Sequence, residues 1–264
     1  MKLCFSTLGC FYMTLEQTLS LANSYGISAI EIRGLSGELD NATIPEFSEA
    51  ERAKTSALFA TRGVLPAVLG TSVSFHNAEK FNASIEKGFE ELALARALGI
   101  ENIRVFGDRL APDKDACIAR VADGLKRLCD SEPSVNVLLE VHGDFNTEQT
   151  LTPVIEKLAD TKNFGLIWDI EHTHKSYKTD WKSFYDFARP YVRHIHIKDF
   201  SDSAQALTLV GGGDVPILPI TERLLCDGYD GYFSLEWEKK WHPELPDIET
   251  ALDSFVGVMK GVKI

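Results

Sequence analysis

The sequence predicts an α/β fold, a single (β/α)8 TIM barrel that spans residues 1–264 as one domain. Three observations support this prediction. Strand-like and helix-like hydrophobic patterns alternate from end to end, which is typical of a parallel sheet. The chain has 264 residues, close to the ~250 that such a barrel takes. No Gly/Ser-rich or Pro-rich linker interrupts the alternation, so the repeats favour one closed barrel.

The predicted strands are short apolar runs, several of which carry polar residues at alternate positions. They lie within 2–7, 28–34, 64–76, 101–107, 135–142, 164–170, 191–199 and 232–238. The predicted helices are amphipathic runs, of which the first closes at Gly26 and the third at Gly99. They cover 15–26, 47–62, 79–98, 114–130, 147–160, 181–188, 216–226 and 247–260.

An open, doubly wound sheet is the alternative arrangement for alternating strands and helices. That fold needs a phosphate-binding GxGxxG turn after its first strand. Here the first strand is followed by LGCFYM, and the glycine cluster at 211–213 comes only after the seventh strand. We therefore expect a closed barrel in which this cluster belongs to a βα loop.

Composition limits the classes of partner. The formal net charge of −12 argues against a nucleic-acid partner, because such binding relies on Lys and Arg to neutralise phosphates. The N-terminal segment lacks the apolar region of a signal peptide, and no run reaches the ~20 apolar residues of a membrane span. The five cysteines form an odd set without a CxxC pair. These features predict a cytoplasmic protein with reduced thiols that does not enter a membrane.

Four apolar runs in the second half of the chain each end in a possible metal ligand. The runs are LLEVH, LIWDIEH, RHIHIKD and YFSLEWE, and the two-residue period of a strand places one polar residue of each on a common face. These residues are Glu140, Asp169, His196 and Glu236. Functional groups of a (β/α)8 barrel lie at the C-terminal strand ends, so the four should converge. Three carboxylates and an imidazole at one point predict a divalent cation that neutralises them.

Other polar residues near the strand ends are candidates for substrate contact. His142 and His172 lie just beyond Glu140 and Asp169, while His194 lies deeper on its strand and is expected to pack or to support the ligands. Four more residues end the second, third and fourth strands, where a structural ion pair is the alternative role: Glu31, Arg33, His76 and Arg104. Three donors follow Glu236 and could hold a substrate phosphate, unless they form an ordinary solvated loop: Lys239, Lys240 and His242.

These strings resemble the xylose isomerase-like superfamily of TIM barrels, which contains sugar isomerases and epimerases and also endonuclease IV-type proteins. The resemblance covers essentially the whole chain and includes the pair Asp169 and His172 and the terminal Glu236 of GYDGYFSLEWE. It implies that Glu140, Asp169, His196 and Glu236 bind one metal ion, and that Glu140 and Glu236 are also the catalytic acid and base groups. The oxygen-rich donor set favours Mn²⁺ or Mg²⁺, with Zn²⁺ or Co²⁺ as other occupants.

The function predicted from the resemblance is that of a metal-dependent sugar or sugar-phosphate isomerase or epimerase. Such an enzyme removes a proton from the carbon next to a carbonyl group, and the metal ion stabilises the enediolate. A small sugar is the expected partner, and the resemblance also suggests a homo-oligomer. The predicted substrate-binding residues are His172, His142, His76, Arg33 and Lys239.

Three alternatives remain. The HIKD string with its glycine-rich loop is similar to inosose dehydratase-like members, which eliminate water from a cyclic polyol ketone. A barrel that binds sugar without turnover is the second alternative, because a fold does not specify an activity. An endonuclease IV-like nuclease is the third, but the stretch SDSAQALTLVGGGD holds no downstream histidine for a three-metal cluster.

Overall fold

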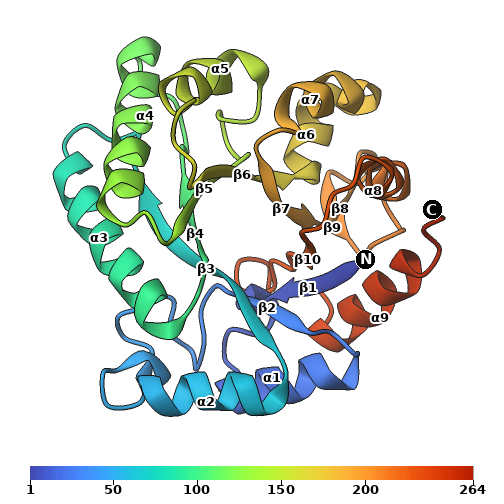
Figure 1. The fold of residues 1–264 in the computed structure, drawn as a ribbon. Coiled ribbons are helices and arrows are strands. Elements are labelled where there is room, and N and C mark those ends of the chain that lie inside the picture. Colours follow the sequence, from blue (N-terminus) through green and yellow to red (C-terminus); the bar gives the residue numbers. More distant parts are fainter. Residues whose placement is uncertain (264) are drawn as a thin grey trace.

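Eight parallel strands close into a barrel in the computed structural model, which describes residues 1–263 (Figure 1). Around the barrel the strands follow the order β1, β10, β7, β6, β5, β4, β3, β2, and every neighbouring pair is parallel. The closed sheet confirms the predicted single (β/α)8 barrel. The strands are β1 (Lys2–Ser6), β2 (Ala29–Ile32), β3 (Leu65–Ser74), β4 (Asn102–Phe106), β5 (Asn136–Glu140), β6 (Phe164–Asp169), β7 (Val192–Ile197) and β10 (Tyr232–Leu235).

Helices surround the barrel on its outside (Figure 1). Those that match predicted runs are α1 (Leu15–Ser24), α2 (Arg52–Arg62), α3 (Phe81–Leu98), α4 (Lys114–Ser131), α5 (Glu148–Lys157), α7 (Trp181–Ala188), α8 (Ile217–Cys226) and α9 (Ile248–Met259). The second helix begins later than predicted, because Pro45–Phe47 forms a separate 3-10 turn. Gly99 follows α3 with a φ of 71°, the left-handed conformation that ends a helix.

Two elements that follow the ligand-bearing strands β6 and β7 were not predicted. Helix α6 (Ile170–Tyr177) follows β6 without a loop, because the Asp169 side chain caps it by accepting hydrogen bonds from the backbone N–H of Glu171 and of His172. The second is a hairpin of β8 (Asp199–Ser201) and β9 (Ala206–Thr208). Both elements follow directly after strands that carry proposed ligands, so they shape the mouth of the site.

Asp199 holds the glycine-rich segment after the hairpin in place. Its two carboxylate oxygens accept hydrogen bonds from the backbone N–H of Gly211, Gly213 and Val215, at 2.8, 3.0 and 3.2 Å. A Cβ at Gly213 would lie 2.3 Å from Asp199 Oδ1, so only glycine fits this close approach. The glycine cluster therefore builds a βα loop, as predicted, and it is tied to the end of β7.

Alternation along the strands separates the core from the site. Ile195 and Ile197 of β7 and Phe233 and Leu235 of β10 are fully buried in the large apolar cluster that includes the helices. A smaller cluster, drawn from β1, β2, β3, β5 and β6, contains Cys4, Ala29, Ala67, Val68, Leu138 and Ile167. Leu138 and Ile167 lie two positions before proposed ligands and on the same face of their strands. Apolar side chains thus fill the barrel below the site.

No described helix combines the length and the apolar character needed to cross a membrane. All five cysteines are free, and four of them are buried.

Candidate metal centre

Four side chains from four strand ends meet inside the barrel mouth. Glu140 ends β5, Asp169 ends β6, His196 lies on β7 and Glu236 directly follows β10. Each offers one ligand atom, and these four atoms lie within 4.8 Å of one another. All four residues are buried, with at most 3% of the surface of any one exposed. The structure therefore brings together the whole set that strand periodicity selected.

The donor atoms of this set fit a divalent cation. His196 Nδ1 lies 3.0 Å from Glu140 Oε1 and 3.5 Å from Glu236 Oε2, so the imidazole points between the carboxylates. Two buried oxygens, Glu140 Oε2 and Asp169 Oδ2, accept no hydrogen bond of good geometry from the described residues. Arg104 and Lys198 approach these oxygens as ion-pair partners, at 3.2 and 3.0 Å, but without a well-directed hydrogen bond, so each oxygen keeps a lone pair that a metal cation can take. Three carboxylates and one imidazole suit Mn²⁺, Mg²⁺, Zn²⁺ or Co²⁺.

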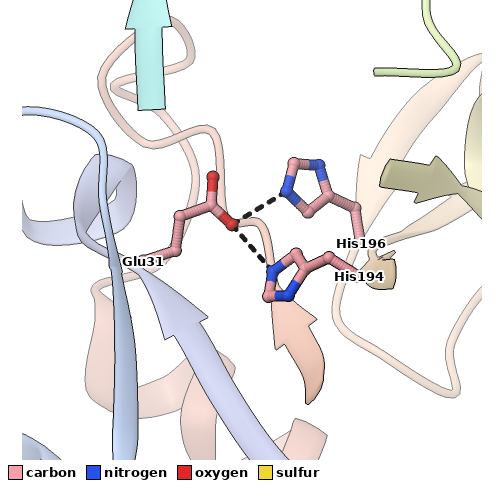
Figure 2. A group of neighbouring side chains, drawn as sticks. All are labelled: Glu31, His194 and His196. Atoms are coloured by element: carbon pink, nitrogen blue, oxygen red, sulfur yellow. Dashed lines mark hydrogen bonds and ion pairs between the residues drawn. The ribbon is translucent and has the colours of Figure 1, made fainter. Parts of the chain in front are cut away.

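A carboxylate from the other side of the barrel orients the histidine ligand. Glu31 of β2 places Oε2 2.8 Å from His196 Nε2 and 3.2 Å from His194 Nε2 (Figure 2). Ser234 of β10 donates a third hydrogen bond to the same oxygen, at 3.3 Å. Glu31, Glu236 and Glu140 outweigh burial and raise the pKa of His196 well above its usual value, so both ring nitrogens hold a proton in this structure. A metal ion would replace the proton on Nδ1, which faces Glu140 and Glu236, while Nε2 donates to Glu31. This carboxylate–histidine pairing is a common way to fix a metal-binding imidazole.

Two buried cations contact the carboxylates of the centre. Arg104 Nη1 lies 3.2 Å from Glu140 Oε2 and 3.3 Å from Glu236 Oε1. Lys198 Nζ lies 3.0 Å from Asp169 Oδ2 and 2.7 Å from Glu236 Oε2, and it also pairs with Glu238. The sequence predicted that a metal ion alone neutralises the carboxylates. In the structure, a guanidinium and an ammonium contact all three of them.

These contacts set the protonation of the two proposed catalytic carboxylates. Burial alone would raise the pKa of Glu236, but Lys198, His196 and Arg104 together lower it well below its usual value. The pKa of Glu140 is also lowered, because Arg104 and His196 outweigh burial and the nearby Glu236. Both groups are therefore ionised at neutral pH and are available to accept a proton or to bind a metal ion.

Two histidines form one wall beside the centre. The rings of His142 and His172 have centroids 4.1 Å apart, and Phe106 contacts His142 on its other side at 5.3 Å. Burial and the positive charge of Lys198 lower the pKa of His172 to about 2, so this imidazole is neutral. A neutral imidazole offers one donor and one acceptor, which suits contact with hydroxyl groups.

A cavity of ≈ 550 Å³ lies next to this wall and has the size of a small-molecule site. Helix α6, the β8–β9 hairpin and the loop after β10 line it. Its lining side chains are mostly polar and include His142, Glu171, His172, Lys175, Phe200, Glu238, His242 and Glu244. Two of the predicted substrate-binding residues, His142 and His172, thus border both the cavity and the centre.

The remaining predicted substrate-binding residues lie in three different places. Arg33, just after β2, donates from Nη2 to Ser72 Oγ at 3.0 Å. His76 follows β3 and pairs with Asp108 at 3.6 Å, with 29% of its side chain exposed. Lys239 contacts the backbone carbonyl of Leu245 and lies 3.2 Å from Asp247 Oδ1. None of these three residues is among those that line the cavity.

Sequence reasoning gave too little weight to Lys198, Arg104 and Glu31. The signal for Lys198 was present, because it lies two positions after His196 and therefore on the same face of β7. Glu31 and Arg104 occupy inward positions on β2 and β4, but which carboxylate or histidine each would contact depends on how the barrel closes. Only the closed order of the strands places β4 beside β5 and across from β10, and brings Glu31 of β2 within reach of His196 on β7.

The sequence profile of the xylose isomerase-like TIM barrel family matches residues 19–256. Comparison with curated protein sequences finds no match. Solved structures resemble the fold over almost the whole chain. The IolI protein with a bound zinc atom has a TM-score of 0.80 at 20% identity, and the alignment covers 100% of this chain and 99% of that one.

Two further solved structures extend this likeness. The probable 3-DHS dehydratase AsbF of petrobactin synthesis from Bacillus anthracis has a TM-score of 0.79 at 18% identity, covering 98% of this chain and 99% of its own. A D-tagatose 3-epimerase-like protein has a TM-score of 0.76 at 18% identity, covering 99% and 97%. At these identities the likeness establishes the fold, and the reaction must be argued from the site.

Proposed function

This chain belongs to the xylose isomerase-like TIM barrel family, and we propose that it is a divalent-metal-dependent isomerase or epimerase of a sugar or sugar phosphate. The reaction is proton transfer at a carbon next to a carbonyl group. One observation carries the proposal. Two ionised carboxylates, Glu140 and Glu236, approach the same histidine nitrogen from β5 and β10, with β6 and β7 between them.

The two carboxylates can reach a substrate from two sides. When bound by Glu140, Asp169, His196 and Glu236, a divalent ion supplies a Lewis acid that polarises the carbonyl group and lowers the energy of the enediolate. One carboxylate accepts the proton from the carbon next to the carbonyl group. Isomerisation requires the same group to return that proton to the neighbouring carbon. Epimerisation requires the other carboxyl group to deliver a proton to the opposite face.

Base strength and charge stabilisation are balanced in this site. Lys198, His196 and Arg104 lower the pKa of Glu236, and Arg104 and His196 lower that of Glu140, which makes each a weaker base. Arg104 and Lys198 also contact Glu236, the proposed base, so they would lie close to the negative charge of an enediolate formed beside it. Buried fixed cations stabilise such charge without reorganisation. The arrangement therefore favours the reaction by acidifying the substrate rather than by strengthening the base.

A second reaction, dehydration of a polyol ketone, is supported by Lys198. Elimination of water needs a base for the C–H proton and also an acid that protonates the departing hydroxyl group. The Lys198 ammonium lies 2.7 Å from Glu236 Oε2 and is fully buried beside the centre, so an acid and a base are adjacent. Dehydration is the alternative that the HIKD string suggested, and Lys198 is its proposed acid.

Isotope exchange tests the proposal directly. Purified protein is analysed for bound metal and then incubated in D₂O, with Mn²⁺, Mg²⁺, Co²⁺ or Zn²⁺, with a panel of ketoses, aldoses, their phosphates and inososes. Isomerisation or epimerisation places deuterium on the carbon next to the carbonyl group without loss of water, as NMR and mass spectrometry detect. An unsaturated or deoxy product assigns dehydration instead. Absence of exchange and of dehydration with every metal would favour a binding protein and would contradict the proposal.

A further inference from the structure

We propose that the substrate carries a carboxylate group and that Arg33 binds it at the barrel mouth. This inference deepens the proposed function, because it names the class of substrate for the same site. It is carried by a buried guanidinium that no carboxylate of the described chain neutralises.

The position of Arg33 directs it toward the mouth. It follows β2 two positions after Glu31 and therefore lies on the inward face, one layer above the carboxylate that orients His196. The residue is only 7% exposed, and its Nη2 donates to Ser72 Oγ at 3.0 Å. Ser72 is an exposed residue on β3. The guanidinium is thus buried along its length but ends beside a residue that solvent reaches.

Arg33 differs from the other two buried cations of the mouth in what it contacts. Arg104 lies within 4.0 Å of two carboxylates and Lys198 within 4.0 Å of three. Within residues 1–263, Arg33 forms no such ion pair, and its hydrogen bonds go to Ser72 and, at 3.5 Å, to the Leu39 carbonyl oxygen. A guanidinium has five N–H donors, so most of its capacity is unused in the described structure.

Arg33 is largely buried and has no ion-pair partner among the described residues, but none of its nitrogens is a buried donor without a partner, so its free donors reach solvent. An anionic ligand can therefore approach the guanidinium and provide the partner. Burial and the positive charge of Arg104 lower the pKa of Arg33 to about 10, which leaves it charged at neutral pH. Glu140 and Glu236 lie near enough to oppose this shift but do not pair with Arg33. An anionic group of the substrate would supply the missing charge beside the metal centre.

The number of free donors selects a carboxylate over a phosphate. One guanidinium matches the two oxygens of a carboxylate in a planar, two-point contact, and Ser72 can add a hydroxyl donor. A phosphate dianion presents three oxygens and needs more donors. The lysines that could add them are engaged: Lys175 with Glu171, Lys239 with Asp247, and Lys240 over the Phe11 ring at 4.1 Å. The substrate class is therefore a polyhydroxylated keto acid.

A matched set of three ketoses tests this inference by binding, without turnover. D-fructose, D-fructuronate and D-fructose 6-phosphate differ only at the sixth carbon, which is neutral, a carboxylate or a phosphate. Isothermal titration calorimetry measures each Kd with the Mn²⁺-loaded and the metal-free protein. We expect fructuronate to bind about 10–100-fold more tightly than the other two ketoses, because only its carboxylate forms the planar, hydrogen-bonded ion pair with Arg33. Arg33→Gln should remove the preference, whereas Arg33→Lys should retain part of it.

Controls keep the outcome interpretable. Arg96→Gln changes an exposed arginine on α3 that pairs with Glu132, and it should leave all three Kd values unchanged. If Arg33→Gln does not fold, Ser72→Ala provides the test through an exposed residue, with an expected loss of about threefold to tenfold for fructuronate alone.

Specific outcomes overturn the inference. Equal binding of fructose and fructuronate, or a preference for fructuronate that persists in Arg33→Gln, would contradict it. Tighter binding of fructose 6-phosphate would show that the anion is a phosphate and not a carboxylate. Deuterium exchange into a neutral ketose, together with no preference for the acid, would leave the proposed function standing while this inference fails. If fructuronate binds in an Arg33-dependent way but the protein shows no deuterium exchange, this inference stands while the proposed function fails.

Discussion

The two halves of the barrel contribute different things to the centre. Strands β5, β6, β7 and β10 supply the four donor side chains that can bind a metal ion. Strands β2 and β4 supply Glu31, Arg33 and Arg104, none of which belongs to that four-residue set. The second half of the chain therefore provides the ligands and one offsetting cation, Lys198, whereas the first half provides Glu31, which orients His196, and Arg104, which offsets two of the carboxylates. The four donor residues by themselves therefore describe only part of the site, because they do not include Glu31, Arg33 and Arg104.

Electrostatics explains why both halves are needed. Glu140 and Glu236 are buried, and their mutual repulsion would raise the pKa of either one. Arg104 contacts Glu140 from the neighbouring strand and Glu236 across the barrel, and its own pKa is raised because these carboxylates and Glu31 outweigh its burial. Glu31 in turn holds His196. Substitutions in the two halves should therefore have different effects, because one kind removes a metal ligand and the other removes a residue that supports the ligands.

Removal of metal should have the largest effect, because it leaves the ligand half without its cation. Dialysis against EDTA is expected to abolish isotope exchange, and added Mn²⁺ should restore it. Metal at 100 times its Kd should also stabilise the fold by about 2.7 kcal/mol, which calorimetry detects as a rise of roughly 5–10 °C in Tm. Full activity in metal-free protein, verified by elemental analysis, would contradict the assignment of the centre.

Glu236→Gln should have the next largest effect, because it keeps the shape of the side chain but removes the proton acceptor. We expect turnover to fall about 10²–10⁴-fold, the usual contribution of a general acid or base. The far-ultraviolet circular dichroism should not change. Glu249→Gln, on the exposed surface of α9, is the matched control and should keep full activity. Retained activity in Glu236→Gln would rule out this residue as the base.

Glu31→Gln tests the supporting half directly. Loss of the carboxylate that holds His196 should weaken metal binding about 10–100-fold without removing any ligand. Calorimetric titration with Mn²⁺ gives the Kd. Glu91→Gln is the control, because Glu91 is also a buried carboxylate of the same half and its contacts are with Asn41 and Lys87, not with a proposed ligand. An unchanged Kd in Glu31→Gln would show that β2 does not support the centre.

Thr14→Ala should have the smallest effect and should be confined to stability. Thr14 and Gln17 form a capping box at the start of α1, in the same half as Glu31. Loss of this cap is expected to cost about 1 kcal/mol of the free energy of unfolding. Urea denaturation measures that cost. A changed Mn²⁺ affinity in this variant would indicate that general stability, rather than Glu31, controls the metal site.

Much of the fold was predictable because it rests on local patterns. The eight strands and the helices between them follow from alternation of hydrophobic periods. Helix α6 was missed because its start depends on Asp169, which caps the helix with Oδ1 while Oδ2 faces the centre. The β8–β9 hairpin was missed because the side chain of Asp199 organises it through contacts 12 to 16 residues away.

The sequence by itself determined which side chains face the barrel interior at the strand ends, because the two-residue period of a strand fixes the face of each residue. This period alone identifies Glu140, Asp169, His196 and Glu236 as inward-facing candidate ligands. Only the tertiary structure decided their partners. Closing the barrel brings Glu31 to His196 across 165 positions of sequence and Arg104 to Glu236 across 132. Such contacts depend on strand order and register around the whole barrel, which no local pattern encodes.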